Sequence, residues 1–130
     1  MNPIQHLKVL IVEDSNELAQ LMQIMLRDMG IQSEYVHTGH GALDFLTRQM
    51  PDLMILDIGL PEMSGWQVLD QAELRQHKVA FPVIVLTAHD DPMNRLIGKM
   101  HKPVVRYLFK PFRISALSSA VRDVLNLAEQ

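Results

Sequence analysis

Polar side chains follow short apolar runs at four places in this sequence, and their types suit phosphate or metal chemistry. In chain order they are Glu13 and Asp14, then Asp57, Thr87 and Lys110. Unbroken apolar runs are typical of strands that are buried on both faces. In a parallel sheet the carboxyl ends of such strands meet at one edge, which is where ligands bind. The spacing therefore predicts that these five side chains share one site.

Asp57 is the residue around which this site is expected to form. It directly follows the apolar run 53–56, and Gly59 and Pro61 mark the loop behind it, so its carboxylate should be fixed at the tip of a strand. A carboxylate held there is a candidate nucleophile or metal ligand. The simplest alternative for Asp57 taken alone is an aspartate that only caps the next turn.

The five side chains together favour phosphate chemistry over a simple turn. Glu13, Asp14 and Asp57 would repel one another without a cation, and oxygen ligands suit a hard ion such as Mg²⁺. The hydroxyl of Thr87 and the ammonium of Lys110 could contact the remaining oxygens of a phosphoryl group. The set predicts an aspartate that accepts phosphate.

These side chains require a parallel sheet to bring them together. The expected strands are 9–12, 31–36, 53–56, 83–86 and 104–108. They alternate with helical segments, which predicts a doubly wound α/β fold. The three strands with unbroken apolar runs should be central, and the more polar second and the fifth should be edges. The expected order is therefore 2-1-3-4-5, in which the first and third strands are neighbours.

Apolar residues recur at helical spacing in each segment after a strand, so five helices are expected. Ser15 and Asp91 are candidate caps, and Gly30 and Pro51 are candidate stops. The fourth helix carries Gly98 in its interior, so we expect it to be among the least stable elements. The last helix is expected to open with Lys110-Pro111-Phe112.

Composition indicates one soluble domain. The 130 residues are 48% hydrophobic and 21% charged, which excludes a disordered chain, and the lack of cysteine excludes disulfides and thiolate metal sites. The polar segment 1–8 leads into an apolar run too short for a signal peptide or a membrane span. We therefore expect a cytoplasmic protein with no membrane partner.

The sequence resembles the response-regulator receiver domain of two-component signalling, the family to which the chemotaxis regulator belongs, over about residues 8–127. The resemblance is carried in order by Glu13-Asp14, Asp57, Pro61 with Gly65, Thr87-Ala88, and Lys110-Pro111-Phe112. Each mark alone is common, but all five at the family spacing are specific. The resemblance implies a flavodoxin-like (βα)5 fold and a single receiver domain over 1–130, with no output domain in this chain.

The resemblance also implies a magnesium site and no other cofactor. Asp14 and Asp57 would bind Mg²⁺ directly, together with the main-chain carbonyl of Gly59. Glu13 would act on the ion through water. These metal ligands follow from the family and not from the spacing alone.

A phosphoryl transfer is implied as well. Asp57 would attack the phosphorus of a phosphohistidine in a sensor histidine kinase or phosphotransfer protein, Lys110 would pair with the phosphate, and Thr87 would donate a hydrogen bond to it. The peptide between Lys110 and Pro111 is expected to be cis. Tyr107 matches the switch aromatic of the family, which moves between exposed and buried positions as Thr87 shifts. Such a domain assists its own phosphorylation and dephosphorylation but is not a turnover enzyme.

Some positions depart from the family or vary within it. Pro103-Val104 replaces the usual small Gly-Ala pair before the fifth strand, which leaves open the path of the loop near Thr87. Gly59 and His89 stand where the family varies and where access of water to the phosphoryl group is set. His89 could influence the lifetime of the phosphate, and the alternative is a surface histidine. The remaining histidines, which are His6, His37, His40, His77 and His101, are expected to face solvent, and none has metal-ligand spacing.

Three alternatives remain. The receiver could be part of a larger DNA-binding regulator or hybrid histidine kinase, which a reading frame continuing past Gln130 would decide. A flavodoxin-like cofactor binder would need a phosphate loop rich in Ser, Thr and Gly after the first strand. An aspartyl phosphohydrolase would need an acid at position 59, where this chain has Gly59.

Charge is unevenly distributed along the chain. Residues 92–122 contain seven bases, from Arg95 to Arg122, and no acid, although the net charge is −3. Arg106 and Ala116 stand where dimerising relatives carry acids. We therefore expect the face of the fourth helix, fifth strand and fifth helix to receive an acidic partner segment and not a second copy. A merely solvated basic surface and weak nucleic-acid attraction are the alternatives, and direct DNA binding is not expected.

Overall fold

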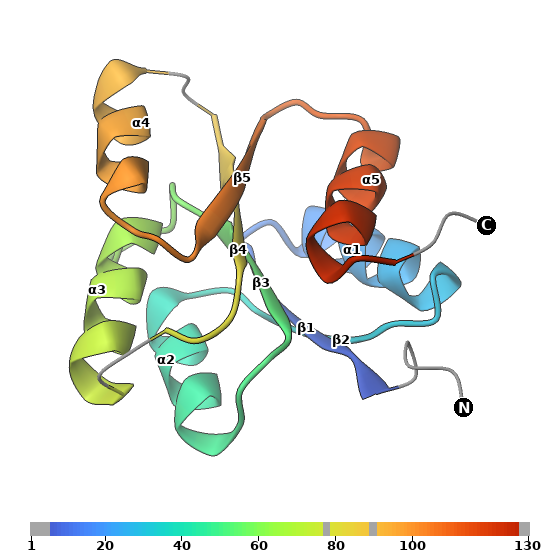
Figure 1. Ribbon diagram of the computed structural model, residues 1–130, viewed down its shortest axis with the longest axis horizontal. Coiled ribbons are helices and arrows are strands. Elements are labelled where there is room, and N and C mark those ends of the chain that lie inside the picture. Colours follow the sequence, from blue (N-terminus) through green and yellow to red (C-terminus); the bar gives the residue numbers. More distant parts are fainter. Residues whose placement is uncertain (1–5, 77–78, 89–90, 128–130) are drawn as a thin grey trace.

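The computed structural model describes residues 6–76, 79–88 and 91–127 (Figure 1). Within them one parallel sheet runs in the order β2-β1-β3-β4-β5, which confirms the predicted order. The strands are β1 (Lys8–Val12), β2 (Gln32–Val36), β3 (Leu53–Asp57), β4 (Val83–Thr87) and β5 (Val104–Phe109). The helices are α1 (Asn16–Asp28), α2 (Gly39–Arg48), α3 (Gly65–Gln76), α4 (Pro92–Lys99) and α5 (Ile114–Leu125).

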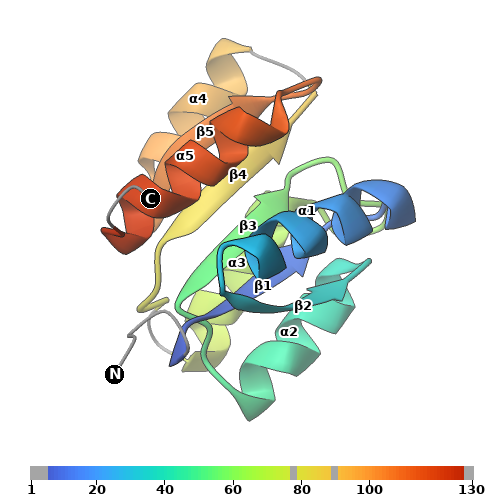
Figure 2. The same ribbon diagram turned by 90° about the vertical axis from the view of Figure 1, so that its right-hand side faces the viewer.

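Helices cover both faces of the sheet. Helices α1 and α5 lie on one face, and α2, α3 and α4 lie on the other (Figures 1 and 2). Alternate residues of each central strand enter the two cores, so Ile55 packs in the α1/α5 core and Leu56 in the α2/α3 core. This alternation is why the central strands need apolar residues at every position.

Burial explains the strand order. Every residue of β3 and β4 is buried, whereas β2 contains no buried residue and β5 is only partly covered. The edge strands can therefore carry polar side chains such as Gln32 and Arg106 without a desolvation cost. In the described part of the chain no helix is long and apolar enough to cross a membrane.

Helix boundaries mostly follow the predicted caps. The hydroxyl of Ser15 accepts a hydrogen bond from the Leu18 N–H at 3.3 Å, and the carboxylate of Asp91 accepts one from the Asn94 N–H at 2.7 Å. The prediction that Lys110-Pro111-Phe112 opens the last helix was wrong, because α5 begins at Ile114. A residue before proline avoids the helical region, which keeps the chain extended at this point.

Candidate functional site

The predicted site residues meet at one edge of the sheet. Strand β1 pairs with β3, β3 with β4, and β4 with β5, all in parallel, so that their carboxyl ends lie side by side. Glu13 and Asp14 follow β1, Asp57 ends β3, Thr87 ends β4 and Lys110 follows β5. The topology alone thus brings together residues as far apart in sequence as 13 and 110.

Asp57 is held by contacts to both of its carboxylate oxygens. The Gly59 N–H donates a hydrogen bond to Oδ1 at 2.9 Å, and Oδ2 lies 3.2 Å from Nζ of Lys110. The side chain is almost enclosed, since Asp57 is only 4% exposed. Asp57 therefore caps the turn after β3, as the simple alternative expected, and its second oxygen still faces the other site residues.

Glu13 is the most deeply buried acid of the site, with no exposed surface. Its Oε2 accepts a hydrogen bond from the Ser15 N–H at 3.0 Å, and its Oε1 accepts one from Nζ of Lys110 at 2.8 Å. Burial raises the pKa of Glu13 above its ordinary 4.5, and the hydrogen bond from Lys110 opposes that rise. Lys110 therefore favours the ionised form of this buried carboxylate.

Lys110 supplies the positive charge that the acids share. Burial lowers the pKa of Lys110, but the hydrogen bonds and charges of Glu13 and Asp57 outweigh it and raise the pKa above 10.5. The Lys110–Pro111 peptide is cis, as the resemblance implied. The main-chain N–H of Lys110 donates to the carbonyl of Thr87 at 2.8 Å, so the ends of β4 and β5 are joined where the lysine turns inward.

A divalent cation fits the acid cluster. Glu13, Asp14 and Asp57 each place one carboxylate oxygen within 4.8 Å of the others. Three carboxylates with one ammonium leave excess negative charge, and Asp14 is exposed, so it is accessible from solvent. Oxygen-only donors with room for water suit Mg²⁺ better than a softer metal.

The structure also places Gly65 and Thr87, two further residues that carry the resemblance. A Cβ atom on Gly65 would lie 2.8 Å from the carbonyl oxygen of Asp57, so only glycine lets α3 start this close to the end of β3. Thr87 is 4% exposed at the end of β4. The carbonyl of Pro103 accepts a hydrogen bond from the Val83 N–H at 2.8 Å, and Val104 pairs with Val83. The segment that departs from the family pattern therefore lies at the opposite end of β4 from Thr87, and the expectation that it bears on the loop near Thr87 was wrong. His89 lies outside the described residues.

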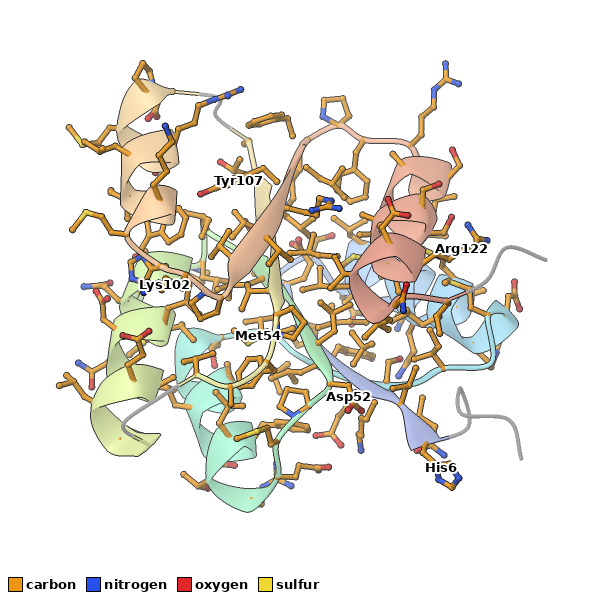
Figure 3. The ribbon with its side chains drawn as sticks, in the orientation of Figure 1. His6, Asp52, Met54, Lys102, Tyr107 and Arg122 are labelled. Carbon is orange, nitrogen blue, oxygen red and sulfur yellow. The ribbon has the colours of Figure 1, made fainter. Side chains whose placement is uncertain are left out.

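Gly98 has a role that sequence reasoning missed. It is the buried residue of α4, and a Cβ atom there would overlap the hydroxyl of Tyr107. That hydroxyl is buried without a hydrogen-bond partner, and the ring lies between α4 and β5 (Figure 3). Burial raises the pKa of Tyr107, with Arg95 opposing it. Because Gly98 has no side chain, it leaves a notch in α4 that accommodates the inward ring of Tyr107. No local sequence pattern shows this contact between Gly98 and Tyr107.

The prediction that the remaining histidines face solvent was wrong for His101. It is 9% exposed, and its ring stacks on Trp66 with centroids 5.4 Å apart. His101 follows α4 at the point where the chain turns towards β5, which presses the ring against α3. His6, His37 and His40 are exposed as predicted, and His77 lies outside the described residues.

The chain is similar to known proteins along nearly its whole length. The family model described as response regulator receiver domain matches residues 9–122. The chain is 32% identical over 122 residues to the alkaline phosphatase synthesis transcriptional regulatory protein PhoP of Bacillus subtilis, covering 94% of this chain and 50% of that protein. It is 36% identical over 122 residues to the transcriptional regulatory protein CreB of Escherichia coli, again covering 94% of this chain and 52% of the relative. The chain thus spans about half the length of the curated relatives it matches.

Solved structures agree in fold. The receiver domain of a signal transduction histidine kinase from Syntrophus aciditrophicus superposes with a TM-score of 0.79 at 32% identity, covering 92% of this chain and 89% of that chain. The chemotaxis response regulator CheY4 of Vibrio cholerae superposes with a TM-score of 0.82 at 27% identity, covering 91% and 98%.

Proposed function

Because this chain belongs to the response regulator receiver domain family, we propose that it is a phosphorylation switch whose phosphoacceptor is Asp57. The observation that carries the proposal is the enclosed Asp57 carboxylate, with Lys110 at 3.2 Å and the oxygens of Glu13 and Asp14 within 4.8 Å of its own. Such a group of one nucleophile, one fixed cation and two further acids suits phosphoryl transfer better than a structural ion pair.

Asp14 and Asp57 would hold Mg²⁺ directly with the Gly59 carbonyl, and Glu13 would act through water. The ion would supply positive charge for the phosphoryl oxygens when bound. When the ion is absent, Lys110 keeps the acids close together, because its Nζ contacts both Glu13 and Asp57.

The transfer step would use Asp57 and Lys110, which are already in contact, together with Thr87. An oxygen of Asp57 forms the new bond to phosphorus while the bond from phosphorus to the histidine nitrogen of the donor breaks, and the imidazole leaves with that electron pair. Lys110 moves from the carboxylate to a phosphoryl oxygen, and Thr87 donates a hydrogen bond to another. Attack of water on the same phosphorus breaks its bond to the Asp57 oxygen, releases inorganic phosphate and restores the free carboxylate. The same side chains would therefore assist both phosphorylation and dephosphorylation.

The output of the switch would pass through β5 and α4. A shift of Thr87 towards the phosphoryl group would open space next to β5 and change the packing of Tyr107. The inward ring has a buried hydroxyl without a partner, which costs free energy and supports an easy exchange between the two positions.

We further propose that the face formed by α4, β5 and α5 receives an acidic segment of a partner. Bases lie on both sides of β5, as Lys102 and Arg122 illustrate (Figure 3). The exposed apolar residues of and next to α4 are Met93, Leu96 and Met100. Apolar contacts surrounded by positive charge suit an acidic, partly apolar segment. Binding of such a partner should weaken with added salt and with Lys99→Glu or Arg106→Glu.

A second candidate keeps the switch within a larger regulator. It is supported by PhoP and CreB, which are described as transcriptional regulatory proteins and are about twice the length of the match. The reading frame after Gln130 distinguishes the two. We also propose a cytoplasmic location for the switch.

The test of the proposed function is phosphorylation by a small-molecule donor. The protein is treated with acetyl phosphate and Mg²⁺ and followed by intact mass. One phosphate should be added, only with Mg²⁺, and none in Asp57→Asn. The control is Asp52→Asn at the other end of β3, where the carboxylate accepts a hydrogen bond from the Lys8 N–H at 2.8 Å. Full labelling of Asp57→Asn would contradict the proposal.

A further inference from the structure

His101 contacts two hydrogen-bond acceptors with its two ring nitrogens. Nε2 lies 2.7 Å from Oδ1 of Asp70 on α3, and Nδ1 lies 3.0 Å from the carbonyl oxygen of Ile97 on α4. A carbonyl and an ionised carboxylate can only accept. A neutral imidazole has a single N–H and would turn a lone pair towards one of the two oxygens. The imidazolium satisfies both.

The ring belongs to a chain of contacts that joins α3 to both ends of α4. His101 stacks on Trp66 of α3, and the indole N–H of Trp66 donates to the side-chain oxygen of Asn94 at 3.1 Å. Asn94 in turn donates from its main chain to Asp91, which caps α4. Asn94 and Trp66 therefore connect the first turn of α4 to α3, and His101 connects the end of α4 to the same helix through Trp66 and Asp70.

The charges around the ring also favour the protonated form. Burial lowers the pKa of His101, but the hydrogen bonds to Asp70 and to the Ile97 carbonyl, together with the charges of Asp70 and Glu73, raise it above 6.5 overall. Both acids come from α3. The group that faces the ring from α4 is the Ile97 carbonyl, and Trp66 adds an aromatic face that also attracts a cation.

We propose that His101 is a positioning residue. As an imidazolium its ring holds α4 against α3, and the helix is released when one of the two ring nitrogens loses its proton. We call this contact of His101 with α3 the latch. The main-chain N–H of His101 donates to the carbonyl of Gly98 at 3.0 Å, so the latch acts on the residue that admits Tyr107. This goes beyond the proposed function, because it adds pH as a second input to the helix that carries the output.

The sign of the pH dependence follows from the contacts. The pKa of His101 is higher in the folded protein than in the unfolded chain. The stabilisation is therefore fully present below about pH 6.5, the unfolded value, and is lost as pH rises through the folded pKa. The latch holds on the acidic side and opens on the alkaline side.

The first test is an NMR titration of the His101 ring nitrogens in the unphosphorylated protein. At pH 6.5 the protonated form should predominate, and Asp70→Asn should lower the pKa because it removes the charge that faces Nε2. The matched control is Asp44→Asn, which removes an exposed acid on α2 and should leave the pKa of His101 unchanged. A ring that is mainly neutral at pH 6.5, or one that Asp70→Asn does not affect, would overturn the proposal.

The second test uses Trp66, the single tryptophan of the chain. Its emission should rise as pH increases through the His101 transition, because a stacked imidazolium quenches indole more than imidazole does and because the packing loosens. His101→Gln should remove this step, and His40→Gln, at an exposed histidine of α2, should retain it. A step that survives in His101→Gln would assign the pH response elsewhere and refute the latch. Neither test uses a phosphodonor, so their result is independent of Asp57.

Discussion

The carboxyl edge of β1 and β3 and the region of α4 and β5 are built in opposite ways. At the edge, Glu13 and Asp57 are enclosed and both oxygens of each carboxylate have a partner. In the α4 and β5 region, Leu96 is 57% exposed, the buried hydroxyl of Tyr107 lacks a partner, and the buried residue of α4 is a glycine. The first region is enclosed and its polar atoms are paired, whereas the second contains an exposed apolar side chain, an unpaired buried hydroxyl and a helix whose buried residue has no side chain.

This difference suits the two proposed functions, which are phosphoryl transfer at the carboxyl edge and a conformational response in α4 and β5. Phosphoryl transfer needs a nucleophile and cations held in one geometry. A helix that must respond to a change of one charge needs two arrangements that differ little in free energy. Elements that move are drawn from the weakly packed part of a fold, and α4 and β5 have those properties here.

The largest expected effect tests whether the two regions really differ in packing. Leu56→Ala in β3 removes a side chain with no exposed surface and should lower the free energy of unfolding by about 3 kcal/mol. Leu96→Ala in α4 should change it by less than about 0.5 kcal/mol. Urea unfolding of both variants measures the contrast. An equal loss in Leu96→Ala would mean that α4 is packed as firmly as the centre of the sheet.

The next effect tests the notch at Gly98. Gly98→Ala should destabilise the protein when Tyr107 is present, because the new Cβ overlaps the hydroxyl. In a Tyr107→Ala background the same substitution should stabilise by up to about 1 kcal/mol through helix propensity. A double-mutant cycle should give a coupling of about 1–3 kcal/mol. A coupling near zero would show that the ring does not depend on the glycine.

Gly98 and His101 also mark the limit of what the sequence could predict. The strand order, the edge strands and the meeting of Glu13, Asp57 and Lys110 followed from apolar runs and from parallel pairing, which are local signals joined by one topological rule. The sequence alone predicts a weak point in a helix at Gly98 and a surface position for His101. Their roles depend on contacts with Tyr107 and Asp70, and no spacing along the chain encodes contacts between α3, α4 and β5.

The third effect is the stabilisation by Mg²⁺, which tests the carboxyl edge of β1 and β3. Mg²⁺ at ten times its dissociation constant should raise the free energy of unfolding by about 1.4 kcal/mol if it binds only the folded protein. Asp14→Asn should reduce this gain, whereas Lys110→Ala should leave most of it and impair phosphorylation, because Lys110 would contact the phosphate and not the ion. Thermal unfolding with and without Mg²⁺ measures the gain. Loss of Mg²⁺ binding with normal phosphorylation in Lys110→Ala would reverse these roles.

A smaller effect tests the unsatisfied hydroxyl. Tyr107→Phe removes a buried polar atom without a partner and should stabilise the protein by about 1 kcal/mol. Tyr35→Phe on the edge strand β2 serves as the control and should stay within about 0.5 kcal/mol. The midpoint of urea unfolding compares them. A loss of stability in Tyr107→Phe would point to a hydrogen bond that the hydroxyl makes in solution.

The smallest effect concerns the basic face formed by α4, β5 and α5. Its exposed apolar residues, among them Leu96 and Met100, favour contact with another surface, and a second copy of the phosphorylated protein is one candidate. A symmetric dimer would bring Lys99 and Arg106 of each copy close to the bases of the other, with no acid in residues 92–122 to neutralise them. Such repulsion is strongest at low salt, where screening is weakest.

We therefore expect the phosphorylated protein to remain monomeric through this face, most clearly at low ionic strength. Sedimentation velocity at low and high salt measures this. Exposed charges of this kind contribute about 1 kcal/mol or less each, so Lys99→Glu and Arg106→Glu should leave the monomer unchanged while they weaken binding of an acidic partner. A tight dimer that persists at low salt and is broken by the same two substitutions would mean that the apolar contacts outweigh the charges, and the face would then be a self-association surface.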